Sequence, residues 1–282
     1  RFEKFADRMG LYRVYALNPD KEVCILIHGI NSSPNTWHEA LNITFADKEV
    51  RERYEFWSFG YPSGASIPYL AANLRDSLHE MLAFRQQKGA TQQRITLIGH
   101  SMGGLLAKAM TQESGDKDWS KIFNVPIEQL EVRSGNREIL RNMIYYQSFP
   151  EVKRVVFCAV PHRGSQIAAN PGLRLVSDVV QMPQQLAQLT SEIVKQSSYA
   201  LTPLGLEIAK KGSNSIDQLR PASPVTAEYL YKPLSPSVEF FSLIGRKDKD
   251  PSKPVDTTSD GVVSYTSAQL DGVVAEKVVM GS

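Results

Sequence analysis

The chain has 282 residues, and its 32 lysines and arginines against 30 aspartates and glutamates give a formal net charge of +2. This near balance, with the basic residues scattered along the chain, argues against nucleic acid as the main partner. The length fits one large α/β domain or two small ones, and the sequence holds no apolar run of the about 18–20 residues that a membrane-spanning helix needs.

Strand-like and helix-like segments alternate along the chain. Strands are expected at 12–17, 23–27, 54–59, 95–98, 152–160, 237–244 and 273–280. Helices are expected at 33–41, 68–87, 173–180 and 186–194, where apolar residues recur near helical spacing. This alternation predicts a mostly parallel central sheet with helices on both faces.

Two segments interrupt the alternation. Residues 114–150 are polar and irregular, and residues 166–235 hold amphipathic stretches broken by prolines. Both are interpreted as excursions from a single domain spanning 1–282. They predict a helical cap or lid over a site, with surface decoration that gates nothing as an equal alternative. Cys24 and Cys158 lie in apolar strand-like runs, and we expect them to be buried free thiols.

The run Gly99-His100-Ser101-Met102-Gly103-Gly104 is the most informative motif of the chain. It contains G-x-S-x-G, follows an expected strand and precedes a helix-forming stretch. A strand, a sharp turn that carries a serine and then a helix are typical of the nucleophile elbow of α/β-hydrolases. The pattern therefore predicts Ser101 as a nucleophile, with glycines such as Gly103 allowing the tight turn.

A serine hydroxyl is a weak nucleophile and needs a base, an orienting acid and an oxyanion hole. One oxyanion N–H is expected from Met102, the residue after the nucleophile. The other is expected from Ile30, in the loop that follows the strand at 23–27 and begins with His28-Gly29. We expect His28 to orient that loop rather than to accept protons.

The acid is expected to follow the nucleophile in the sequence, after a late strand. Asp260 is favoured because it lies between a Ser/Thr run and the apolar run that starts at Gly261. Asp248 and Asp250 are the alternatives, in a loop rich in turn-forming residues. That acidic loop offers oxygen ligands of the kind calcium takes, but turn chemistry is the favoured reason for its composition. No metal or cofactor is expected.

The base is expected last in the chain, but none of the five histidines follows Asp260. His100 adjoins Ser101, and consecutive residues at a sharp elbow point in different directions. His162 follows a strand and is a weaker alternative, because it breaks the order serine, acid, histidine. His38 and His79 are expected to be ordinary helix residues.

These motifs together resemble a bacterial serine esterase or lipase of the α/β-hydrolase superfamily, close to the true lipases. The resemblance rests on residues 28–31, 56–62, 99–104, 161–165, 215–224 and 259–263. It implies the α/β-hydrolase fold, and it implies that Asp260 is the triad acid. It also implies that the base follows the last strand, so we expect the catalytic histidine just beyond Ser282. A tag-derived Gly-Ser pair is the alternative interpretation of the last two residues.

The predicted function is hydrolysis of a carboxylic ester through an acyl-Ser101 intermediate. The expected partner is a small-molecule or lipid ester, with contact to a membrane surface or lipid interface as a further expectation. A lipid-directed acyl hydrolase (phospholipase, thioesterase or lipid-anchor deacylase) is the alternative enzyme. A non-catalytic binding protein on a hydrolase scaffold is the alternative from another class. The resemblance favours an extracytoplasmic, bacterial and lipid-anchored location.

Overall fold

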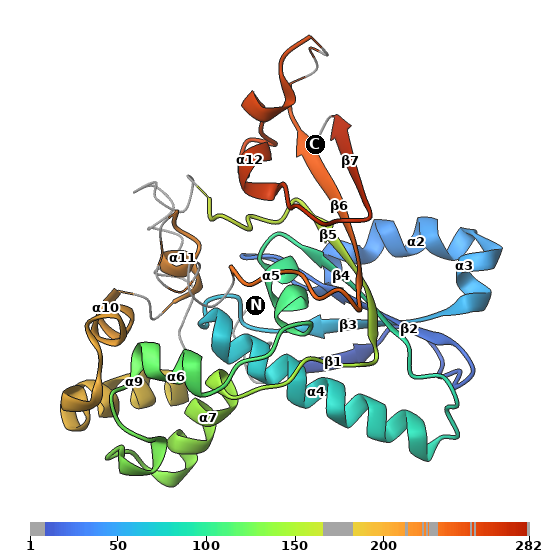
Figure 1. The fold of residues 1–282 in the computed structure, drawn as a ribbon. Helices are drawn as coiled ribbons and strands as arrows, with labels where there is room; N and C mark the ends of the chain where they lie inside the picture. Colours follow the sequence, from blue (N-terminus) through green and yellow to red (C-terminus); the bar gives the residue numbers. More distant parts are fainter. Residues whose placement is uncertain are drawn as a thin grey trace.

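One sheet organises the molecule, as seen in the computed structural model, which describes residues 9–165, 183–211, 214–221, 223, 225, 231–248, 250 and 252–280. Within this part of the chain seven strands lie in the order β1-β3-β2-β4-β5-β6-β7 (Figure 1). β1 runs antiparallel to β3, and every other neighbouring pair is parallel. The strands are β1 (Gly10–Arg13), β2 (Glu22–Ile27), β3 (Tyr54–Gly60), β4 (Ile95–His100), β5 (Val152–Cys158), β6 (Glu239–Arg246) and β7 (Ala275–Met280).

Helices cover the sheet and extend beyond it. The α-helices are α2 (His38–Ala46), α3 (Lys48–Arg53), α4 (Ile67–Gln87), α5 (Met102–Ala109), α6 (Asp116–Ile122), α7 (Ser134–Ile144), α9 (Gln184–Gln196), α10 (Pro203–Lys211), α11 (Ser215–Gln218) and α12 (Tyr265–Ala268). Short 3₁₀ turns are η1 (Pro34–Trp37), η2 (Ile127–Gln129), η4 (Ser198–Ala200) and η6 (Val255–Thr257). The mostly parallel sheet and the long helix expected at 68–87 are confirmed.

β2 shows why the sheet is buried on both faces. Ile25 and Ile27 belong to the large core shared with α4 and α5, whereas Cys24 and Leu26 belong to a smaller core with residues of η1, α2 and α3. A strand between two covered faces is apolar at every position, which is the pattern of this run. Cys24 and Cys158 are free thiols, and burial raises the pKa of Cys24 to about 12.

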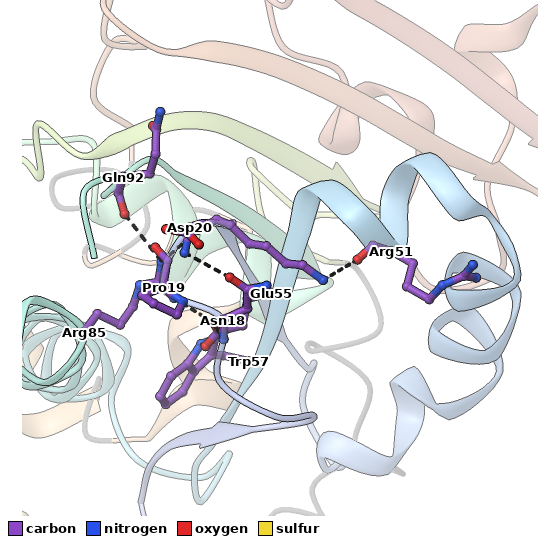
Figure 2. A network of polar contacts seen from close by, with 9 residues as sticks. Asn18, Pro19, Asp20, Arg51, Glu55, Trp57, Arg85 and Gln92 are labelled. Carbon is purple, nitrogen blue, oxygen red and sulfur yellow. Dashed lines mark hydrogen bonds and ion pairs between the residues drawn. The ribbon is translucent and has the colours of Figure 1, made fainter. Parts of the chain in front are cut away.

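A buried ion pair holds the amino ends of the parallel strands together (Figure 2). Arg85 near the end of α4 donates to Glu55 at the start of β3 over 2.7 Å, and both side chains are almost fully buried. Arg85 also donates to the carbonyl oxygen of Lys21, and Trp57 Nε1 donates to Glu55 over 2.7 Å. These hydrogen bonds compensate two charges that would otherwise be costly to bury.

The segment expected to be irregular, 114–150, instead contains α6, η2 and α7. Its helices form because their apolar faces are buried, as at Trp119, Leu140 and Ile144. The helices at 184–211 provide the opposite surface, since Thr202 donates its backbone N–H to Ile122 and Asn136 donates to Glu192. The helices α6, α7, α9 and α10 thus pack together beside the start of α4 (Figure 1), and we call these four helices the helical cap.

Three other sequence expectations compare with the structure as follows. The first strand lies at Gly10–Arg13, earlier than the expected 12–17. The helix expected at 173–180 and the end of the chain at Ser282 lie outside the described residues. No described helix has the length and apolarity that crossing a membrane requires.

Candidate active site

Ser101 occupies a strained turn between β4 and α5. Its backbone angles are φ 52° and ψ −127°, a region that residues with a Cβ rarely adopt. Its N–H donates to the carbonyl oxygen of Cys158 over 2.9 Å, which ties the turn to β5. The turn lies at the carboxyl edge of the sheet, where open α/β sheets hold their ligands.

The glycines around Ser101 are required by close contacts, with backbone atoms at Gly99 and Gly103 and with a side chain at Gly104. A Cβ on Gly99 would lie 2.4 Å from Cα of Gly104, and one on Gly103 would lie 2.3 Å from the carbonyl oxygen of Ile27. A Cβ on Gly104 would lie 2.1 Å from Cγ2 of Val160. The helix α5 can therefore approach the sheet only with glycine at these three positions.

The loop after β2 lies directly against the elbow. A Cβ on Gly29 would lie 2.9 Å from Cβ of Ser101 and 3.1 Å from Nδ1 of His100. His28 holds this loop: its Nδ1 lies 2.8 Å from the Gly29 carbonyl oxygen, and its ring stacks on Tyr61 with centroids 4.1 Å apart. Burial lowers the pKa of His28 to about 4, so its ring is neutral at neutral pH.

Two backbone N–H groups beside Ser101 are available to a ligand. Within the described part of the chain, neither Ile30 nor Met102 donates its N–H to a protein acceptor. The next residue, Asn31, has φ 50° and donates its own N–H to Ser63 Oγ over 3.0 Å. The Asn31 contact fixes the loop, and the Ile30 N–H has no acceptor within the part of the chain that the structure describes.

Asp260 lies at the same edge of the sheet as the elbow. Its Oδ1 accepts hydrogen bonds from the backbone N–H groups of Val262 and Val263, each over 2.7 Å, so a tight turn fixes the carboxylate. The Asp260 charge reaches His100 and raises its pKa, although burial lowers that pKa more strongly. The structure thus brings the favoured acid near the elbow.

The alternative acids are engaged in their own loop. Asp248 Oδ2 pairs with Lys253, which holds the pKa of Asp248 below its usual range. Asp250 Oδ1 accepts from the backbone and hydroxyl of Ser252. These contacts agree with the turn chemistry expected from the sequence. Across the described ranges, no cluster of three or more His, Cys, Asp or Glu side chains is arranged to hold a metal ion.

The histidines differ sharply in their surroundings. His162 is 2% exposed, meets Phe157 edge-on, and has neither ring nitrogen hydrogen-bonded among the described residues. Burial keeps its pKa well below the usual value, so it is poorly suited to accept a proton. His100 keeps part of its surface in solvent, while its ring nitrogen Nδ1 lies against Gly29, away from solvent. Among the described residues, no histidine is hydrogen-bonded to Ser101 or Asp260.

Sequence reasoning missed the residues that hold the loop after β2 in place. Tyr61 donates its hydroxyl proton to the carbonyl oxygen of His28, and Ser63 accepts from Asn31. Both residues follow β3, the strand next to β2. Residues 61–64 read Tyr-Pro-Ser-Gly, a composition typical of a turn, but the sequence does not show what this turn contacts, because the pairing depends on strand order.

The strand order, the strained serine turn and the loop after β2 define an α/β-hydrolase fold. The family model of the PGAP1-like alpha/beta domain matches residues 63–121, which include α4 and the elbow. The chain is also similar to the Staphylococcus hyicus lipase, with a TM-score of 0.53 and 12% identity over 94% of this chain and 87% of that one. The mature Bacillus licheniformis lipase BlEst2 gives a TM-score of 0.52 and 15% identity over 95% and 89%. No curated protein matches the sequence.

Proposed function

We propose that this protein is a serine hydrolase of carboxylic esters, with Ser101 as nucleophile and Asp260 as the orienting acid. One observation supports this most directly. Ser101 has a positive φ, the N–H groups of Ile30 and Met102 have no acceptor among the described residues, and Asp260 lies near the same elbow. These are the parts that acyl transfer through a serine requires.

The chemistry follows from these positions. Ser101 Oγ attacks the ester carbonyl carbon as its proton passes to a base, and the N–H groups of Ile30 and Met102 stabilise the oxyanion. The alcohol leaves with that proton, and an acyl-Ser101 ester remains. Water, activated by the same base, then attacks the acyl carbon and releases the acid. Each N–H donor of such a hole contributes about 10²–10³ in kcat.

The base completes the proposal. In α/β-hydrolases the base is a histidine ring held between the nucleophile and the acid. β7 pairs in parallel with β6, so its carboxyl end lies at the same edge as Asp260, which approaches Gly245 of β6. Asp260 Oδ1 accepts the two backbone N–H groups of its own turn, and Oδ2 has no hydrogen-bond partner among the described residues. We assign Oδ2 the task of accepting the ring N–H of that histidine.

A fluorophosphonate probe tests the nucleophile, using the full chain that the coding sequence specifies. We expect labelling at Ser101 alone, found by peptide mass spectrometry, and loss of labelling and of aryl-ester turnover in Ser101→Ala. Ser134→Ala is the control, because Ser134 is exposed on α7 in the cap. Full turnover by Ser101→Ala would overturn the proposal. Wild-type protein that neither reacts with the probe nor turns over esters would favour the binding-protein alternative.

A further inference from the structure

A lysine of α5 is buried without a counter-charge among the described residues. Lys108 is 3% exposed and lies in the helix that begins at the elbow. Its ammonium group makes no hydrogen bond or ion pair with a described residue, and the charge that acts on it is the positive one of Arg163. Burial and that charge lower the pKa of Lys108 to about 8. Because lysine is almost never buried unless it is paired, the position indicates a missing anionic partner.

A second polar group without a partner lies beside this lysine. His162, in the turn after β5, is 2% exposed, and neither of its ring nitrogens is hydrogen-bonded within the described chain. The positive charges of Lys108 and Arg163 both reach its ring, and Phe157 packs edge-on against it. A neutral imidazole always carries one N–H donor, and a buried donor without an acceptor is costly. One anion would satisfy both the histidine and the lysine.

Arg163 adds a third donor to the pair. Its Nη1 donates to the carbonyl oxygens of Thr266 and Gln269, so the guanidinium is held from the side of α12. Its Nε and Nη2 make no hydrogen bond with a described residue, and its guanidinium carbon lies 5.9 Å from the ring centroid of Tyr231. We call Lys108, His162 and Arg163 the basic cluster. No described carboxylate acts on Lys108 or His162.

The turn that carries two members of the basic cluster is fixed on several sides. Gly164 has φ 84°, and a Cβ there would lie 2.8 Å from the backbone N of Pro221. The carbonyl oxygen of Gly164 accepts the hydroxyl proton of Ser267. Ser165 Oγ donates to the carbonyl oxygen of Val262 over 2.6 Å, within the turn that holds Asp260. The cluster is therefore built on a rigid turn that also supports the proposed acid.

We propose that Lys108, His162 and Arg163 form a binding site for an oxyanion of the phosphate type. A phosphate or sulfate dianion matches the charges of the lysine and the arginine, and its four oxygen atoms can accept from three separate side chains. Seven residues separate Lys108 from Ser101, so at the rise of an α-helix the site lies about 10 Å from the elbow along α5. It is thus distinct from the proposed oxyanion hole, and it does not depend on ester hydrolysis.

Titration calorimetry with inorganic phosphate tests the site on the full chain. We expect saturable binding by the wild type that weakens about 10–100-fold in Lys108→Met, as the loss of one charge-assisted hydrogen bond predicts. Lys117→Met is the control, because it removes the same charge from an exposed position on α6. It should bind phosphate like the wild type. No saturable binding by the wild type, or equal weakening in both variants, would overturn the proposal.

Proton uptake gives a readout that a merely structural lysine would not move. Sulfate does not titrate near neutral pH, so it is the probe, used at pH 8 in buffers of different ionisation enthalpy. Lys108 is then partly deprotonated, and we expect sulfate to draw in about half a proton as it holds the ammonium form. Lys108→Arg should keep binding and lose the uptake, because arginine stays charged. Equal uptake in the wild type and Lys108→Arg would contradict the role of Lys108.

Two esters distinguish a free anion from a phosphate group carried by a larger ligand. One aryl ester has an acyl chain that ends in a phosphate group, and its counterpart ends in a hydroxyl group. A KM that rises about tenfold in Lys108→Met for the phosphorylated ester alone would assign the site to the substrate. Equal responses of both esters, with phosphate still bound, would assign it to a free ion. Phosphate binding without turnover of either ester would keep the site and reject the proposed hydrolysis, and turnover without phosphate binding would do the reverse.

Discussion

Gly29 and Ser101 lie so close that a Cβ on Gly29 would be 2.9 Å from the Cβ of Ser101. The loop that follows β2 and the turn that follows β4 therefore fit together only with glycine at position 29. Because Ile30 comes next, the same contact sets where its N–H points. The proposed nucleophile and one proposed oxyanion donor are thus positioned by a single steric contact.

Substitution of Gly29 tests that contact. In Gly29→Ala the new methyl group displaces the loop and moves the Ile30 N–H, so we expect kcat to fall about 10²–10³-fold, the loss typical of one oxyanion donor. KM should change little. Gly135→Ala is the control, because a Cβ at Gly135 in α7 meets no atom within 4 Å. Steady-state kinetics on an activated ester measure both; an unchanged kcat in Gly29→Ala would contradict the assignment.

The two glycines that begin α5 should respond differently to a second substitution. Gly104→Ala collides with the Val160 side chain at 2.1 Å, whereas Gly103→Ala collides with the Ile27 carbonyl oxygen at 2.3 Å. We expect each of the two substitutions to lower the free energy of unfolding by about 1–3 kcal/mol or more, as overpacking does. Val160→Ala should restore part of the loss in Gly104→Ala and none in Gly103→Ala. Urea unfolding measures this, and equal rescue of both variants would contradict it.

The sequence predicts the elbow and the central strands well because their signals are local. Glycines around Ser101 and unbroken apolar runs such as 23–27 depend only on neighbouring residues. The cap helices were not predicted at 114–150, because the surfaces they pack against lie elsewhere in the chain: α7 packs against α4, and α6 packs against α10. A segment that is polar on most of its surface then resembles a loop.

The burial of the ion pair could not be predicted from the sequence for a similar reason. Arginine and glutamate are normally exposed, so nothing in the sequence marks Arg85 and Glu55 as interior residues. Their burial follows from mutual pairing and from carbonyl oxygens of loops that meet only in the folded sheet. The candidate site has a comparable part, since Ser63 and Asn31 meet only because β3 lies beside β2.

Replacing one partner of the buried ion pair should lower the free energy of unfolding far more than replacing both partners. Arg85→Met leaves the Glu55 carboxylate buried without its cation, and we expect a loss of about 3–5 kcal/mol in the free energy of unfolding. Arg85→Met with Glu55→Leu should recover a large part of that loss, although Trp57 Nε1 then lacks its acceptor. The fluorescence of the three tryptophans reports the transition in urea. A double variant less stable than the single one would contradict this account.

Acid should destabilise the fold through His28. Burial lowers its pKa to about 4, whereas the unfolded value is about 6.5. Between these values the unfolded chain binds a proton that the folded chain excludes, so the free energy of unfolding falls as the pH falls. The difference between the two pKa values corresponds to about 3 kcal/mol of the free energy of unfolding. This amount is lost in full only when the pH falls below the pKa of His28 in the folded chain.

Urea titrations across that pH range measure the effect. His28→Asn should show a weaker pH dependence than the wild type, and His38→Asn, at an exposed position, should match the wild type. The buried His162 adds to the loss in all three proteins, because its pKa is also lowered. A His28 ring that titrates near its ordinary pKa by NMR would refute the assignment.

Two substitutions of an aspartate by its amide, Asp260→Asn and Asp248→Asn, test which residue is the orienting acid. Asp260→Asn keeps an oxygen that can accept from Val262 and Val263, so the turn survives while the charge is lost. We expect kcat to fall about 10⁴-fold, the loss seen when a triad acid becomes an amide, and Asp248→Asn to leave kcat unchanged. An independent readout comes from His100, whose pKa the Asp260 charge raises: it should fall in Asp260→Asn and stay constant in Asp248→Asn. If Asp248→Asn instead loses activity while Asp260→Asn retains it, the acid lies in the 246–256 loop.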